Sequence, residues 1–109
     1  MSYDAGLLQR CRDALDAAGM RPLRDKNVFG MRGLLLGKRM FAAVGDTSII
    51  VRMRETELAA ALRQPGVAAF TPGGQSLGTW VEVQGDVVAD DPELRDWLDA
   101  GLRSLRTSA

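Results

Sequence analysis

The side chains that could carry out chemistry are few in this chain of 109 residues. It has no histidine and a single cysteine, Cys11. Histidine is the commonest general base and metal ligand, and a cysteine without a histidine has no evident group to hold it as a reactive thiolate. Cys11 also falls on the apolar stripe of a predicted helix. We therefore expect a buried thiol that reacts slowly with alkylating reagents.

Two further patterns could bind ligands, but each has a simpler structural interpretation. Asp90 and Asp91 could form a carboxylate pair for a metal or for acid–base catalysis, yet they directly precede Pro92, where aspartate caps the start of a helix. The glycine segments 30–33 and 73–74 match neither a phosphate-binding loop nor a dinucleotide-binding motif, and are more typical of turns. We predict that the chain is not an enzyme and has no catalytic residue, cofactor or metal.

The composition predicts one soluble globular domain over residues 1–109. Hydrophobic residues make up 46% and charged residues 26%, and the formal net charge is zero. A chain of this kind has no default disorder and no overall attraction to nucleic acid or anionic lipid. The charge is uneven, however, because residues 21–63 carry nine Lys and Arg against four Asp and Glu. The single cysteine and the lack of a signal peptide or membrane-spanning run predict a cytoplasmic protein without a membrane partner.

The hydrophobic periodicity predicts the elements that must position any site. The centre, Gly30 to Met53, is cut by Gly37-Lys38 and Gly45-Asp46 into three short apolar runs, which favours a three-stranded antiparallel meander. Ser2 or Asp4 can cap a first helix. The other expected elements are a helix at 4–18, an edge strand at 23–29, a helix at 55–64 with Leu58, Ala61 and Leu62 buried, a strand at 67–70, a loop at 71–78, a strand at 80–83 and a helix from Asp91.

This order predicts the fold class α+β. We expect a single two-layer domain, with an antiparallel sheet of about four to six strands packed by helices, in the order α-β-β-β(-β)-α-β-β-α. Alternation within the strand at 39–44 predicts that Met40, Ala42 and Val44 point into the core.

The same alternation gathers aromatic, apolar and cationic side chains on the opposite face of the sheet, where they are typical of a protein contact surface. These candidate partner-binding residues are Arg39, Phe41, Ile50, Arg52 and Trp80, with Glu82 beside them.

Two other interpretations of this face stay open. A helix or the loop at 71–78 could cover part of it, which would make its residues structural. Alternatively, the basic central segment could bind nucleic acid directly through Lys38, Arg39, Arg52 and Arg54, although the aromatic motif of the common RNA-binding sheets is absent.

Several short segments, taken in order, resemble the TfoX N-terminal domain family, also called Sxy-like, over nearly the whole chain. They are Met1-Ser2-Tyr3-Asp4, Val28-Phe29-Gly30, Gly37-Lys38, Met40-Phe41-Ala42, Val51-Arg52, the run from Leu62 to Val67, Trp80-Val81 and the run from Leu94 to Leu98. Family members tend to have Met-Phe-Gly-Gly where this chain has Val28 to Met31, and basic residues where it has Gln75 and Gly78.

The resemblance implies a compact α+β domain and an association with bacterial regulators of competence and transcription. In those regulators a second domain often follows, so a chain that stops at Ala109 resembles a stand-alone version. The family supplies no catalytic residues to transfer. We therefore expect a non-enzymatic regulatory or adaptor domain that acts through a protein partner or self-association, with direct nucleic-acid binding as the alternative.

Overall fold

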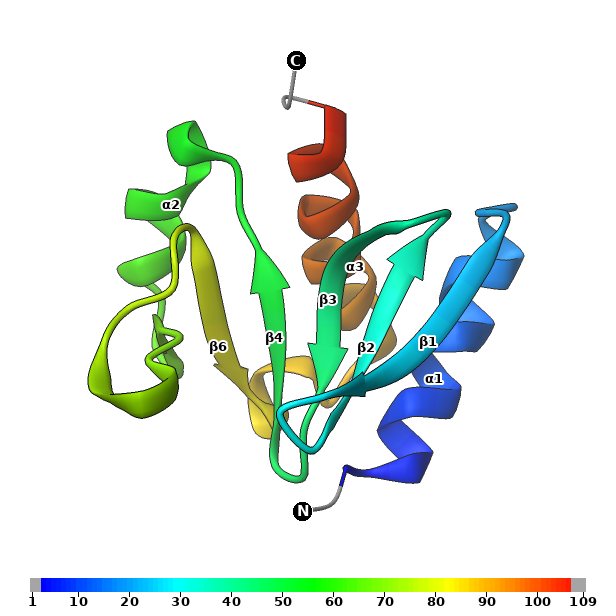
Figure 1. Cartoon of the computed structure of the whole chain (residues 1–109), viewed down its shortest axis with the longest axis horizontal. Helices are drawn as coiled ribbons and strands as arrows, with labels where there is room; N and C mark the ends of the chain where they lie inside the picture. The colour runs from blue at the N-terminus through cyan, green and yellow to red at the C-terminus, as the bar shows by residue number, and fades with distance from the viewer. Residues whose placement is uncertain (1–2, 107–109) are drawn as a thin grey trace.

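The computed structural model describes residues 3–106, which form three α-helices and six β-strands (Figure 1). Along the chain the elements are α1 (Ala5–Ala17), β1 (Leu23–Val28), β2 (Met31–Leu36), β3 (Arg39–Val44), β4 (Ser48–Arg52), α2 (Glu55–Leu62), β5 (Val67–Ala69), β6 (Trp80–Gln84) and α3 (Asp91–Arg106). Short 3-10 helices occupy Pro72–Gly74 and Gly85–Val88. The predicted class and element order are confirmed.

The six strands form one antiparallel sheet in the spatial order β1-β2-β3-β4-β6-β5. The predicted meander is β2, β3 and β4, and the predicted edge strand is β1. Gly37 has a φ of 65° in the turn between β2 and β3, a conformation that glycine adopts without strain. Asp4 caps α1 by accepting a hydrogen bond from the Leu7 amide, whereas the alternative cap, Ser2, lies outside the described residues.

The three helices lie over one face of the sheet, and the main core lies between them and that face. α3 packs across β3 and β4, α1 packs beside α3, and α2 packs against β5. Residues spaced three or four apart on α1 and α3 point into this core, as their amphipathic patterns require. The core contains Leu7, Cys11 and Leu15 of α1, Leu94, Leu98 and Leu105 of α3, and Leu34, Ala42, Val44, Ile49, Val51, Val81 and Val83 of the sheet.

A glycine sets how closely α3 approaches the sheet. A β-carbon built on Gly101 would lie 2.8 Å from the backbone oxygen of Phe41 and 3.3 Å from Cγ1 of Val51. Real side chains do not come so near to backbone atoms, so α3 reaches its position only because residue 101 has no side chain. The consequence is a dry, close contact between the middle of α3 and the middle of the sheet.

The alternation predicted for β3 is confirmed for Ala42 and Val44, which lie in the core, but it is wrong for Met40 and Phe41 because of a β-bulge. Leu34 of β2 pairs with Ala42, but the next residue, Leu35, pairs with Met40, so Phe41 is an extra residue in β3. Such a bulge changes which face the residues before it point to. Phe41 is fully buried against Gly101 on the helix-covered face, while Met40 packs near Gly33 on the other face.

The face away from the helices closes on itself because the sheet curls. The rings of Phe29, at the turn after β1, and Phe70, just after β5, are 6.3 Å apart, although β1 and β5 are the two edges of the sheet. Ala43 and Ile50 are buried on this inner face. In α2, Ala61 is buried as predicted, but Leu62 is 38% exposed, so the prediction of a buried Leu62 is wrong.

Candidate functional site

The structure does not assemble the predicted contact surface from all of its residues. Phe41 lies on the helix-covered face, and Ile50 is only 2% exposed. Arg52 pairs with Trp80 across β4 and β6, and both are half-buried. The prediction that all five residues share one exposed surface is therefore wrong. The bulge in β3 turns Phe41 to the other face of the sheet, and the curled sheet covers Ile50.

The three arginines proposed for nucleic acid contact groups of the chain itself. Arg39 donates to the carbonyl of Leu105 over 2.6 Å, and Arg52 donates to that of Ser104 over 3.3 Å. Both carbonyls belong to the last turn of α3, where cations compensate the negative end of a helix. Arg54 lies 3.9 Å from Glu57, and Lys38 is exposed in the turn between β2 and β3.

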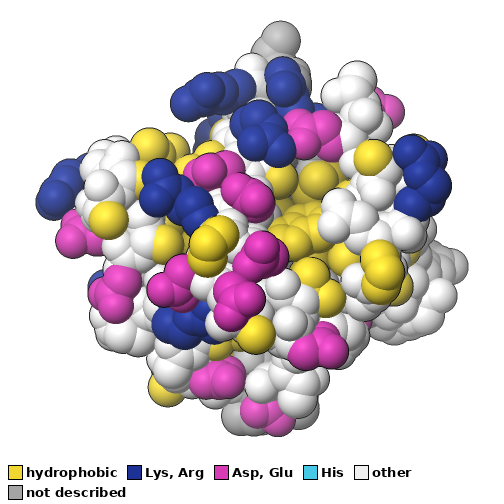
Figure 2. Space-filling view, turned by 180° about the vertical axis from the view of Figure 1, so that it is seen from behind, with side chains coloured by type: hydrophobic (Ala, Val, Ile, Leu, Met, Phe, Trp, Pro, Cys, Tyr) yellow, Lys and Arg dark blue, Asp and Glu magenta, His cyan; other side chains and the backbone are white. Residues whose placement is uncertain are grey.

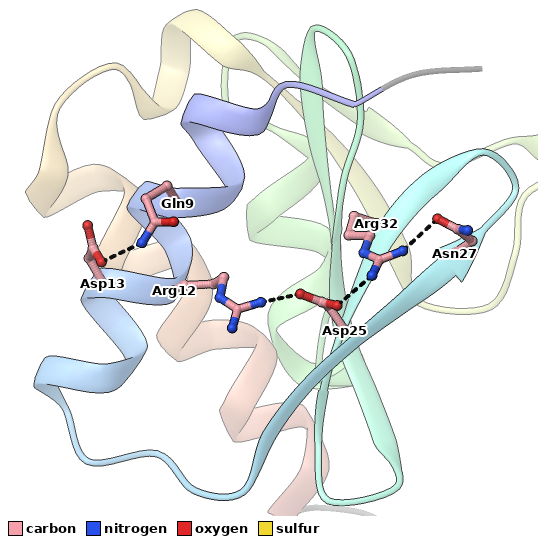
Figure 3. Close-up of polar contacts among 6 residues, drawn as sticks. All are labelled: Gln9, Arg12, Asp13, Asp25, Asn27 and Arg32. Atoms are coloured by element: carbon pink, nitrogen blue, oxygen red, sulfur yellow. Dashed lines mark hydrogen bonds and ion pairs between the residues drawn. The ribbon is translucent and has the colours of Figure 1, made fainter.

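A polar network that the sequence did not reveal ties α1 to the edge of the sheet (Figure 3). The carboxylate of Asp25 on β1, only 13% exposed, lies between the guanidinium groups of Arg12 on α1 and Arg32 on β2. Arg32 donates to Asp25 over 2.9 Å and to the side-chain oxygen of Asn27 over 2.8 Å. Because two cations already hold this carboxylate, the network suits fixing α1 in place and not proton transfer.

A second connection ties α1 to the start of α3. Arg10 of α1 donates to the carbonyls of Val88 and Ala89, over 2.9 and 3.1 Å, and forms an ion pair of 2.9 Å with Asp91. Cys11, one residue further along α1, is fully buried, and this burial raises the pKa of its thiol to about 12. The thiol is therefore protonated at neutral pH and unsuited to nucleophilic attack.

The space between α2 and α3 is open. A groove of about 390 Å³ lies there, and Figure 2 shows hydrophobic side chains within a hollow of the helix-covered face. Its apolar lining comes from both helices, from the end of β4 and from the segment before α3. These lining residues are Met53, Ala60, Ala61, Val87, Trp97 and Ala100.

Charged side chains line the sides of this groove. Arg103 of α3 donates two hydrogen bonds to Glu57 of α2, over 2.6 and 3.1 Å. The hydrogen bond from Arg103 lowers the pKa of the Glu57 carboxyl below its ordinary value. Glu93 and Asp96 line the groove from α3 and are exposed, and neither forms an ion pair with another residue of the 3–106 range.

The α2–α3 groove is therefore the candidate functional site. The sequence analysis missed its α3 side, although Glu93, Asp96, Trp97 and Ala100 recur at helical spacing and so share a stripe. Its α2 side could not be found in this way, because sequence periodicity gives no sign that two helices remain apart. Over residues 3–106, no group of three or more His, Cys, Asp and Glu side chains could hold a metal ion, and no helix is long and apolar enough to cross a membrane.

Comparison with known protein families identifies the family of the chain. A family model described as TfoX N-terminal domain matches residues 12–105. That range extends from the middle of α1 almost to the end of α3, so it includes every strand of the sheet and both helices that line the groove. A search of curated protein sequences finds no match.

Proposed function

The chain belongs to the TfoX N-terminal domain family, and we propose that it is a non-enzymatic regulatory or adaptor domain that acts through protein contacts. It would affect transcription indirectly, by binding a protein and not DNA. The observation that carries this proposal is the open α2–α3 groove with its apolar lining. A concave site with an apolar floor and polar sides is typical of places where a ligand or another protein binds.

The groove suits binding better than catalysis. The polar side chains along it carry three carboxylates, one amide, one hydroxyl, the indole of Trp97 and one guanidinium, and the guanidinium of Arg103 is held by Glu57. A nucleophile paired with a base, as covalent catalysis requires, is not among its lining residues. Its floor is instead formed by Trp97 and small side chains such as Ala61 and Ala100, which leave room for side chains supplied by a partner.

Two adjacent alanines of α2 allow a matched test. Ala60 is exposed and lines the groove, whereas Ala59 is exposed but does not line it. Wild-type, A60R and A59R proteins would serve as baits in a lysate of the source organism, with captured proteins quantified by mass spectrometry. We expect a partner that wild type and A59R retain and A60R loses. Equal retention of every captured protein by A60R would refute the groove as the contact site.

Direct nucleic-acid binding through Lys38, Arg39, Arg52 and Arg54 is the alternative function. It loses support because Arg39 and Arg52 bind the last turn of α3. Phosphate contacts make affinity fall steeply with salt, so binding should be measured on duplex DNA and single-stranded RNA from about 50 to 200 mM salt. We expect no binding at the lowest salt. Tight binding with a steep salt dependence would favour the alternative.

A further inference from the structure

We infer that the α2–α3 groove binds a cationic amphipathic helix, one that places apolar side chains on the groove floor and Lys or Arg side chains beside Glu93 and Asp96. This inference rests on the proposed function and specifies the chemistry of the partner. Charge, shape and the state of the existing ion pair each point to such a partner.

The charge of the groove selects a cation. Three carboxylates line it, from Glu57, Glu93 and Asp96, against the single guanidinium of Arg103. Glu57 and Arg103 already neutralise each other through two hydrogen bonds. The uncompensated charge therefore comes from Glu93 and Asp96, both exposed on α3. Complementary charge from a partner would steer association and fix its register, whereas an acidic partner would meet repulsion.

The shape of the groove selects a helix. Two helices on the same sheet face form its walls, and α2, with eight residues, is about 12 Å long. Two turns of a third helix fit along that length, and the side chains of the third helix would enter the space that Ala60 and Ala100 leave open. Helices that bind in such grooves use apolar residues spaced three or four apart, which leaves their other face free to carry the cations.

The tryptophan on the floor supplies a direct readout. The chain has two tryptophans, and only Trp97 is among the groove lining. A W80F protein keeps Trp97 as the single tryptophan, so its fluorescence reports occupation of the groove. The probes are three synthetic 18-residue peptides. The first is a Leu/Arg amphipathic helix, the second a scrambled peptide of the same composition, and the third the same helix with Glu in place of Arg.

We expect the Leu/Arg helix to change the Trp97 emission in a saturable manner and the other two peptides to leave it unchanged. E93Q/D96N should weaken that binding about tenfold and reduce its dependence on salt. D13N/D16N is the matched control, because it removes two carboxylates from α1, outside the groove, and should bind as wild type does. A60R should abolish binding and A59R should not.

The outcomes separate this inference from the proposed function. If the Glu peptide binds as tightly as the Arg peptide, or if E93Q/D96N leaves the affinity unchanged, the cationic partner is refuted. If the scrambled peptide binds equally well, or no peptide binds, the helical partner is refuted. In either case the capture experiment with A60R and A59R still decides independently whether the groove is a protein contact site.

Discussion

The two flanks of α3, one toward α1 and one toward α2, differ in how many polar contacts fasten them. Toward α1, three arginines bind carboxylates or carbonyls of neighbouring elements, and Cys11 is fully buried. Toward α2, the hydrogen-bonded pair of Glu57 and Arg103 crosses a groove that stays open. Grooves lie on both sides of α3, but the α1 flank is fastened by several ion pairs and hydrogen bonds, whereas a single pair crosses the α2 flank.

The difference has a cause in side-chain size. α2 has only eight residues, and Ala59, Ala60 and Ala61 fill its middle. Ala60 and Ala61 line the groove, but their methyl groups do not reach far enough to fill the space toward α3. On the other flank, Leu7 and Leu15 of α1 reach the core. A short helix with small side chains therefore leaves a groove between α2 and α3.

The largest expected effect comes from displacing α3, the helix that both flanks share. In G101A, the new β-carbon would overlap the backbone oxygen of Phe41, which only a shift of α3 could relieve. We expect a loss of about 3 kcal/mol in the free energy of unfolding, as overpacked cores show, measured by urea denaturation. A G101A protein as stable as wild type would contradict the close contact between α3 and β3.

The next largest effect comes from removing the ion pairs that tie α1 to the edge of the sheet. D25N leaves the guanidinium groups of Arg12 and Arg32 without their shared carboxylate, which is 13% exposed in the native fold. We expect a loss of about 2 kcal/mol in the free energy of unfolding, because one substitution removes the carboxylate that accepts charged hydrogen bonds from two guanidinium groups. The control is D16N, because Asp16 and Arg21 are both 74% exposed, and its effect should stay within about 0.5 kcal/mol. Equal effects would show that the Asp25 network contributes no special stability.

The buried thiol of α1 makes the free energy of unfolding depend on pH. Cys11 has a pKa of about 12 in the fold against an ordinary value of 9.0. Because the unfolded thiol loses its proton at a lower pH than the folded one, burying the neutral thiol contributes its full stability below pH 9. This contribution to the free energy of unfolding is lost as the pH rises toward 12, with about 1 kcal/mol lost by pH 10. Comparing urea denaturation of wild type and C11A from pH 7 to 10 should show this slope in wild type and less of it in C11A. Alkylation of native Cys11 as fast as in urea would refute its burial.

The smallest expected effect on stability comes from the Glu57–Arg103 pair between α2 and α3. E57Q removes the carboxylate that Arg103 holds. We expect a loss of only about 0.5 kcal/mol in the free energy of unfolding, because the pair is partly exposed to solvent. The hydrogen bond from Arg103 lowers the pKa of Glu57 from 4.5. The stability that the ionised Glu57 contributes is therefore fully present above pH 4.5 and is lost as the pH falls through the lowered pKa. Thermal melts of wild type and E57Q should therefore differ at pH 7 and converge at low pH. A difference as large as that of D25N would mean that the two flanks are equally fastened.

The elements could be predicted from the sequence because each has a strong local signal. The glycine-led turns mark the meander, and the leucine stripes mark α1 and α3. The face of Phe41 could not be predicted, since a one-residue bulge changes the alternation without any composition of its own. The groove could not be predicted either, because the gap between α2 and α3 depends on where both helices settle on the sheet.

The most direct test compares the two flanks in one experiment. A benzophenone photocrosslinking amino acid would replace either Gln64, exposed beside the α2–α3 groove, or Gln9, exposed on α1. After irradiation in cells of the source organism, we expect a discrete crosslinked protein from position 64 and none from position 9. Crosslinks from position 9 with none from position 64 would contradict the claim that the α2–α3 groove is the contact surface.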